Sequence, residues 1–230
     1  LLYYQELKNL AENNPGIHYI PVLSREEWDG ATGYVHQVYK DLINAKKNGN
    51  ELPAAHLAGF VAIVIGASYY TKKLPVKKLQ ELCEKLDYPI ILVGGKEDAI
   101  EGEAIAAINP IRIYNACGKF SLHESADLVR KSNLVISHDT GLQYIACAFN
   151  KPVLALWGGT SPLLDVEPYY SEGLRIADKP PYQNFVVPNL SCQPCSNFGT
   201  KTCPKGHFNC MQQQDIVAIV TMAKTYLGNN

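Results

Sequence analysis

From Phe60 onward, short apolar runs alternate with segments of helical periodicity, and this alternation limits the fold more than any other feature of the sequence. Residues 61–65 (Val-Ala-Ile-Val-Ile) contain no polar side chain, which is typical of a strand buried on both faces of a parallel sheet. Further strands are expected at 89–93, 134–137 and 152–157. Repeated β-α units with short turns predict a Rossmann-like parallel α/β sheet with right-handed crossovers.

The segments between these strands have the spacing and the end signals of helices. Pro75 stands at a first helical position, and Ser121-Leu-His-Glu124 is a capping box. Helices are expected at 75–86, 98–108, 121–131, 141–149 and 213–227. Residues 158–210 hold most of the late proline, glycine and cysteine, so they are expected to form long irregular loops.

The first 56 residues have a separate pattern, which indicates a helix, a strand and a second helix at 4–13, 17–23 and 34–45. We therefore expect a partial α/β segment over 1–58 that completes or replaces an N-terminal lobe, followed by a Rossmann-like domain over 59–230. The sequence opens on Leu1-Leu-Tyr-Tyr4 without an initiator methionine or a basic leader. This start predicts a piece of a longer protein with a cytoplasmic location.

Charge and hydropathy exclude two classes of protein. The 21 Lys and Arg residues against 22 Asp and Glu residues give a net charge of −1, which lacks the basic footprint of a general nucleic-acid binder. A local basic patch for one phosphate-bearing small molecule remains compatible with this balance. The longest apolar run, 54–67, is interrupted by His56, Gly59 and Gly66 and falls short of the roughly 18–20 residues of a membrane span. Peripheral contact with a membrane stays open.

Two strand ends carry polar groups that suit a nucleotide. Residues 66–75 place small residues, hydroxyls and two cations ahead of a helix, which makes Ser68, Thr71 and Lys72 candidates for a phosphate site. The alternative there is a solvated lysine pair. After the next strand, Glu97 and Asp98 could accept hydrogen bonds from ribose hydroxyls, as carboxylates do in other nucleotide sites, although Asp98 could instead cap its helix.

A third strand end, Ser137-His-Asp-Thr-Gly-Leu142, leads into a predicted helix. Backbone N–H groups of Thr140 and Gly141 would begin that helix, so a diphosphate could bind at the positive end of the helix dipole. In such sheets ligands lie beyond the carboxyl ends of the strands, which is where all three segments are expected.

The long stretch from Ser137 to Pro162, with Lys72-x-x-Pro75 and a Gly-Gly turn before it, resembles glycosyltransferase family nine, the ADP-heptose:lipopolysaccharide heptosyltransferases and their relatives. The resemblance runs from about Phe60 to the C-terminus. It implies the C-terminal, donor-binding half of a GT-B enzyme, which transfers a sugar with inversion from a nucleotide-diphosphate donor to a glycan or lipopolysaccharide acceptor and needs no catalytic metal.

By the same resemblance, Lys72 would contact the donor's diphosphate and Glu97 or Asp98 its ribose. The donor's phosphates and sugar would be held by Asp139, Thr140 and Gly141.

The sequence departs from the family pattern at two points. Tyr144 stands where most members carry a histidine, and a phenol can donate a hydrogen bond but carries no positive charge. His138 is not a positional substitute and is expected to be structural. No segment corresponds to the acceptor domain with its acidic general base, so the catalytic residue stays unassigned and the enzyme is expected to need a separate acceptor lobe.

Residues 1–56 resemble a second family. Tyr3-Tyr-x-Glu-Leu7, Tyr19 to Glu26 and Gly33-Tyr-Val-His36 are similar to the nicotinamide-binding half of ferredoxin–NADP reductase-type flavoproteins. The resemblance implies that Ser24 and Arg25 meet the 2′-phosphate of NADP and that Tyr34 lies by the adenine. The flavin barrel and the Gly-rich pyrophosphate loop are absent, so an α/β scaffold without cofactor is the alternative. A join near 56–60 would make the chain composite.

Four of the seven cysteines form the cluster Cys192-x2-Cys195-x7-Cys203-x6-Cys210, with His207 nearby. In a reducing compartment such spacing favours a metal over disulfides, most plausibly zinc with iron next. Four thiolates leave no open position, so the ion would be structural and would fix the loop 188–212. Reduced thiols, or disulfides formed on isolation, are the alternative. The other three, Cys83, Cys117 and Cys147, are expected to be buried small hydrophobes.

Three functions follow as hypotheses. The first is a heptosyltransferase-like glycosyltransferase with an ADP-heptose-like donor. A module that binds a nucleotide or nucleotide-sugar without transferring it is the second, and an NADP-dependent oxidoreductase fragment, which rests on residues 1–56 alone, is the third.

Overall fold

The computed structural model describes His56, residues 59–170 and residues 180–228. The helix–strand–helix pattern expected in residues 1–56 lies outside these residues apart from His56, as do Ser24, Arg25 and Tyr34. The division at 58/59 therefore remains a prediction.

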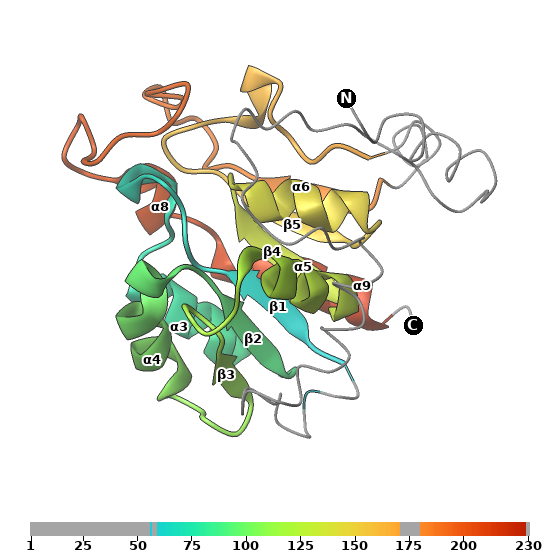
Figure 1. The fold of residues 1–230 in the computed structure, drawn as a ribbon. Coiled ribbons are helices and arrows are strands. Elements are labelled where there is room, and N and C mark those ends of the chain that lie inside the picture. Colours follow the sequence, from blue (N-terminus) through green and yellow to red (C-terminus); the bar gives the residue numbers. More distant parts are fainter. Residues whose placement is uncertain (1–55, 57–58, 171–179, 229–230) are drawn as a thin grey trace, which may run out of the picture. The chain divides into compact units, whose positions relative to one another are not determined.

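Six parallel strands form one sheet in the described part of the chain, in the order β3-β2-β1-β4-β5-β6 (Figure 1). The strands are β1 (Val61–Val64), β2 (Ile90–Val93), β3 (Ile113–Asn115), β4 (Leu134–His138), β5 (Val153–Leu156) and β6 (Tyr182–Phe185). Each adjacent pair is parallel, with Val61 opposite both Ile90 and Leu134. The predicted Rossmann-like α/β class is confirmed.

One face of the sheet is covered by α3 (Val76–Lys85), α4 (Ala99–Ala106), α8 (Asn209–Gln212) and α9 (Ile216–Gly228). Alternate side chains of β1, Val61 and Ile63, point to this face and are buried with Leu79 of α3 and Ile219 of α9. Because successive side chains of a strand point to opposite faces, the remaining positions of β1 are available to a second core.

That second core lies under α5 (Leu122–Lys131) and α6 (Gly141–Ala148). Ala62 and Val64 of β1 pack there with Val129 of α5, Ala146 of α6 and the fully buried Trp157. The predicted capping box opens α5: the Ser121 hydroxyl accepts from Glu124 N, and the Glu124 carboxylate accepts from Ser121 N. Helices on both faces explain why the central strands contain no exposed polar residue.

Two strands were not expected from the sequence. β3 has three residues, one of them the polar Asn115, and β6 lies in the region expected to be irregular. Both are edge strands with one neighbour, and β6 (Tyr-Gln-Asn-Phe) is nowhere fully buried, so neither carries the continuous apolar run that marks a central strand.

The order of the strands also determines where a ligand can bind. The chain crosses from β1 outward to β2 and β3, and then returns to add β4, β5 and β6 on the other side of β1. Such a reversal leaves a crevice beyond the carboxyl ends of β1 and β4. No helix in the described residues is both long and apolar enough to cross a bilayer.

Candidate functional site

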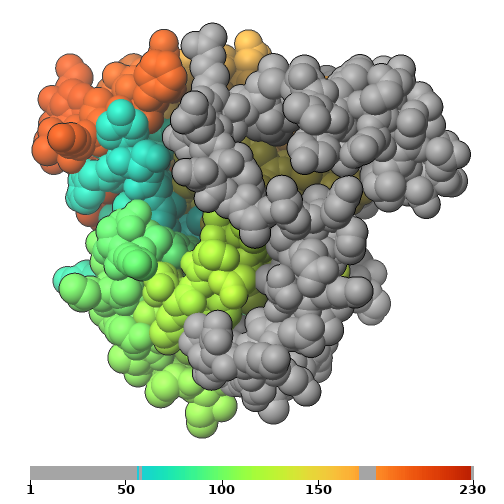
Figure 2. All heavy atoms as spheres, in the orientation of Figure 1, coloured from blue at the N-terminus to red at the C-terminus, as the bar shows by residue number. Residues whose placement is uncertain are grey.

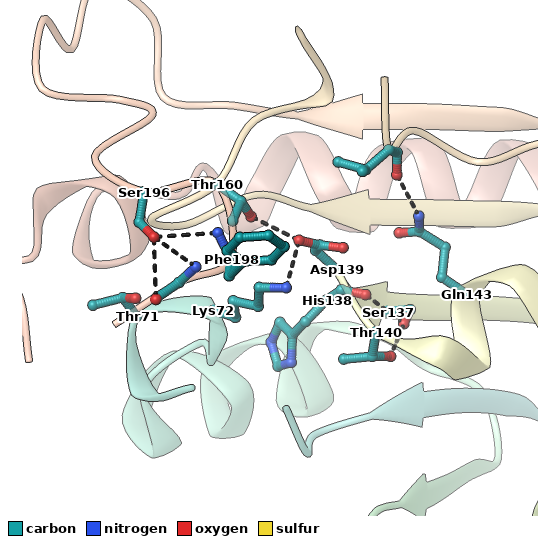
Figure 3. Close-up of polar contacts among 12 residues, drawn as sticks. Thr71, Lys72, Ser137, His138, Asp139, Thr140, Gln143, Thr160, Ser196 and Phe198 are labelled. Carbon is teal, nitrogen blue, oxygen red and sulfur yellow. Dashed lines mark hydrogen bonds and ion pairs between the residues drawn. The ribbon is translucent and has the colours of Figure 1, made fainter. Parts of the chain in front are cut away.

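Three segments that are distant in the sequence meet beyond the carboxyl ends of β1, β4 and β5. Lys72 ends the short 3-10 helix η3 (Tyr70–Lys72), Asp139 directly follows β4, and Thr160 follows β5. The Nζ of Lys72 lies 2.7 Å from Oδ2 of Asp139, and the Thr160 hydroxyl donates to the same oxygen at 2.9 Å (Figure 3). Both ionic side chains are largely buried, at 14% and 9% exposed. The structure thus holds one ammonium group in a fixed place at this edge.

The N-terminus of α6 lies next to this ion pair in the sequence. Thr140 is the residue before the helix, its backbone is extended, and its hydroxyl caps no N–H group of α6. Among the described residues, no atom lies within 4 Å of a Cβ built on Gly141, so none of them fills the space over the helix start. Backbone N–H groups at a helix start lack intrahelical partners and favour anions. These two residues therefore offer donors to a phosphate.

The neighbouring Lys73 has a different set of partners. Its Nζ lies 2.8 Å from Asp98 Oδ1 and 2.6 Å from Glu101 Oε2, and Gly95 N donates to the other Asp98 oxygen at 2.9 Å. Burial alone would lower the pKa of Lys73, but the hydrogen bonds that its ammonium donates to the two carboxylates, together with their negative charge, outweigh burial and raise the pKa above its ordinary value. Asp98 is 2% exposed, whereas Glu97 is exposed. Of the two ribose candidates, Glu97 is therefore the exposed one.

His138 links the end of β4 to the segment that carries both lysines. Its Nε2 accepts a hydrogen bond from Leu74 N at 2.9 Å, and the ring is 1% exposed. Burial lowers the pKa of His138 to about 4, so the imidazole is neutral at pH 7 and can act as an acceptor. This placement is that of a structural histidine, as the sequence predicts.

The buried His138 should make the protein less stable in mild acid. Its pKa in the folded state, about 4, is below the ordinary value of 6.5, so the unfolded chain takes up the proton first as the pH falls. Between pH 7 and pH 5 this difference should cost about 2 kcal/mol of unfolding free energy. Urea unfolding at the two pH values measures it. His138→Gln should lose about 2 kcal/mol less than wild type over this range, because its amide does not titrate.

His123→Gln, at an exposed histidine on α5, is the control that makes the same substitution outside the core. Equal losses of unfolding free energy in wild type and His138→Gln would contradict the assignment of His138 as a buried neutral ring.

Three further candidates take no part in the Lys72–Asp139 ion pair and have other partners or none that is described. Tyr144 donates its hydroxyl to Val166 O at 2.7 Å, and burial, with the Asp139 carboxylate as a lesser cause, raises the pKa of Tyr144 to about 12. Ser68 is exposed on the turn after β1. Thr71 is 1% exposed, and its hydroxyl is hydrogen-bonded to Thr200.

Residues of the late loop take part in this edge of the sheet although no sequence pattern indicated them. Gln193 Nε2 donates to the carbonyl oxygens of Trp157, Gly158 and Thr160 at 3.1, 2.7 and 3.1 Å, which fixes the turn after β5. Phe198 is 74% exposed on the same loop. The sequence indicates Gln193 and Phe198 only through their place in the cysteine-containing segment. Side-chain contacts to backbone carbonyls produce no periodic pattern that a sequence could reveal.

All seven cysteines are free thiols, and Cys83, Cys117 and Cys147 are buried as predicted. Burial, with the neighbouring thiols of Cys195, Cys203 and Cys192 as lesser causes, raises the pKa of Cys210 to about 11. The four clustered thiols therefore share one neighbourhood, with Cys192 Sγ also 3.8 Å from His207 Nε2. Within the described ranges, no three His, Cys, Asp or Glu side chains are arranged as a group that could hold a metal ion.

Comparison with known families decides the membership of the chain. The family model of glycosyltransferase family 9 (heptosyltransferase) matches residues 22–174. The chain belongs to this family. The match begins well before Phe60, where the resemblance was expected to start, and it crosses the join expected at 56–60. It also includes Ser24, Arg25 and Tyr34, to which the reductase resemblance had given NADP-binding roles.

The similarity to individual relatives extends over only part of each relative's length. Lipooligosaccharide heptosyltransferase 2 of Haemophilus influenzae is 37% identical over 89 residues, which are 37% of this chain and 26% of that protein. The structure of Escherichia coli ADP-heptose lipopolysaccharide heptosyltransferase II matches with a TM-score of 0.60 at 18% identity, over 90% of this chain and 56% of that one.

A third similar structure is TibC of enterotoxigenic E. coli, a dodecameric iron-containing heptosyltransferase in complex with ADP-D-β-D-heptose. It matches with a TM-score of 0.52 at 17% identity, over 74% of this chain and 46% of that one. This chain thus matches about a quarter of the length of the curated relative and about half of the length of the two solved structures.

Proposed function

We propose that this chain forms the donor-binding part of a heptosyltransferase-like glycosyltransferase that takes an ADP-heptose-like donor and serves a glycan or lipopolysaccharide acceptor. The observation that carries the proposal is the Lys72–Asp139 pair, at 2.7 Å, beside the N-terminus of α6, where no described residue would contact a Cβ on Gly141. Membership of family 9 and the ADP-heptose bound to TibC support the choice of donor. The cytoplasm is the proposed location.

In this proposal the positive charge for the reaction comes from Lys72 and from the first N–H groups of α6. When the bond between sugar and diphosphate breaks, negative charge develops on the leaving nucleoside diphosphate. A fixed ammonium group and a helix start stabilise that charge without reorganisation. Asp139 and Thr160 hold the ammonium in place before the donor binds. No step of this account requires a catalytic metal.

The remaining parts of the donor are assigned by accessibility. The exposed Glu97 is proposed for the ribose hydroxyls, and Asp98 is proposed to support Lys73 instead. Ser68, exposed on the turn after β1, could reach the phosphates. Tyr144 would have to release Val166 O before its hydroxyl could serve the donor. The general base is proposed to lie in an acceptor lobe.

Calorimetric titration of the full chain with ADP, UDP and NADPH tests this function. The proposal expects ADP to bind, and expects NADPH not to displace it. NADPH binding in the absence of any nucleoside diphosphate binding would favour the oxidoreductase hypothesis instead. Transfer or hydrolysis of ADP-heptose by the purified chain would exclude the alternative that it binds the nucleotide-sugar without acting on it.

We also propose that Cys192, Cys195, Cys203 and Cys210 bind one structural metal ion, zinc or iron. The four thiols share one neighbourhood, and the iron-containing TibC has a similar fold. Thiolates are strong ligands for either ion, and such a site would stabilise a segment that has few apolar residues.

Elemental analysis of the purified chain measures this proposal. About one equivalent of zinc or iron per chain is expected, since thiolate sites hold their metal tightly. Cys203→Ser should lose most of it, whereas Cys83→Ala, on the buried face of α3, should retain it. Less than about 0.2 equivalent of any transition metal in the wild type would contradict the proposal.

A further inference from the structure

The cysteine loop, residues 192–210, contacts the donor site through Thr71. The Thr71 hydroxyl donates to Thr200 O at 3.1 Å and accepts from Thr200 N at 2.7 Å, and Thr71 N donates to Thr200 O at 3.2 Å. Figure 2 shows the orange surface of this loop directly against the cyan surface of the residues that follow β1. The buried Thr71 therefore joins two segments that are 129 residues apart in the sequence.

A second set of hydrogen bonds closes the connection on the other side of Thr71. Gly159 N donates to Thr71 O at 2.7 Å, and Gly159 O accepts from Cys195 N at 3.0 Å and from Ser196 N at 3.2 Å. A Cβ on Gly158 would collide with Thr71 O, so the backbone of the turn after β5 is in direct contact with the backbone of η3. The cysteine loop, η3 and this turn consequently form one hydrogen-bonded unit.

The loop also packs on the side chain of Lys72. Gly199 has a φ of +94°, and a Cβ there would lie 3.2 Å from both Cγ and Cε of Lys72. The Ser196 hydroxyl accepts from Phe198 N and Gly199 N at 3.2 and 3.1 Å, which fixes this turn over the lysine stem (Figure 3). Lys72 directly follows Thr71, so a displacement of the loop would move the ammonium group away from Asp139.

We propose that Thr71 is a positioning residue that couples the position of the cysteine loop to the position of Lys72. Attachment of the loop to η3 and binding of the donor are then cooperative. The inference rests on the proposed function, because it takes Lys72 as the ligand of the donor's diphosphate. Two coupled events stabilise each other to the same extent. Donor binding should therefore hold the loop, and an unattached loop should weaken donor binding.

Thr71→Val tests the connection, because valine keeps the volume of threonine and removes the hydrogen bonds of the hydroxyl to Thr200. Thr200 N then loses its acceptor, and ADP affinity measured by calorimetry should fall about tenfold. Thr71→Ser keeps the hydroxyl and should stay within about threefold of the wild type. Thr221→Val removes an exposed hydroxyl that bonds Val217 O on α9, and serves as the matched control with unchanged affinity.

Hydrogen–deuterium exchange gives a readout that a merely structural role would not change. ADP should slow exchange of the amides in 195–200 in the wild type and in Thr71→Ser, and should fail to do so in Thr71→Val. A wild type that binds ADP without protecting 195–200 would overturn the inference alone, as would equal ADP affinity in wild type and Thr71→Val. Equal loss of affinity in Thr71→Val and Thr71→Ser would also overturn it. A wild type that binds no ADP would overturn the proposed function itself.

Discussion

Lys72→Met should weaken ADP binding roughly 5- to 150-fold, because charge-assisted hydrogen bonds to a phosphate are worth about 1–3 kcal/mol. Methionine keeps an unbranched stem of similar length, so the packing of Gly199 on that stem is retained. In the variant the Asp139 carboxylate is left beside the diphosphate without its cation. Because salt screens the repulsion between these two negative groups, the loss of affinity should be larger at low salt. Calorimetric titration with ADP at two salt concentrations measures both effects.

Two companion variants separate the charge of Lys72 from the charge of the surface. Lys77→Met removes an exposed ammonium from α3, a few residues along the chain, and should leave ADP affinity unchanged. Adding Asp139→Asn to Lys72→Met should recover part of the lost affinity, because it removes the repulsive carboxylate. If Lys72→Met bound ADP as tightly as Lys77→Met, Lys72 would not be a phosphate ligand.

Lys73→Met should instead destabilise the fold, by about 3 kcal/mol of unfolding free energy, because it leaves a buried carboxylate without its counterion. Asp98 is 2% exposed, and without Lys73 its described hydrogen-bond partner is Gly95 N. Urea unfolding at pH 7.5 measures the loss. In contrast to Lys72→Met, ADP affinity should change little at temperatures where the variant is folded.

The double variant Lys73→Met with Asp98→Asn should recover most of the lost stability, since an amide is far less costly to bury than an unpaired carboxylate. Lys85→Met is the surface control. Its ammonium is half exposed and 4.0 Å from Glu81, so it should cost less than about 0.5 kcal/mol. A Lys73→Met variant as stable as Lys85→Met would show that the Lys73–Asp98 pair contributes nothing measurable.

The central strands could be predicted from the sequence because each contains a continuous apolar run. β1, β2 and β5 are apolar throughout, whereas β4 ends with the buried polar residues Ser137 and His138, and all four lie between the two helical layers. β3 and β6 could not be predicted, because edge strands contain polar residues such as Asn115 and Gln183 and their pairing depends on the sheet already being formed. The reductase resemblance rested on short motifs, whereas the family 9 match extends from residue 22 to residue 174.

The site was predictable at the level of segments and not of side chains. Parallel strands bring the residues after β1 and β4 to one edge, and the structure does place Lys72 beside Asp139. Which of two adjacent lysines would face that edge depends on the turn of η3, and which of two adjacent carboxylates would be buried depends on the packing of Asp98 against Lys73. Thr160 and Thr200 act through long-range contacts of irregular segments, for which a single sequence has no signal.

A crystal structure of this chain with ADP would show whether the donor's diphosphate binds between Lys72 and the start of α6. We expect the β-phosphate within hydrogen-bond distance of Lys72 Nζ and of the backbone N–H groups at Thr140 and Gly141, with Glu97 at the ribose. ADP ordered elsewhere on the molecule, with the start of α6 free of phosphate, would contradict it.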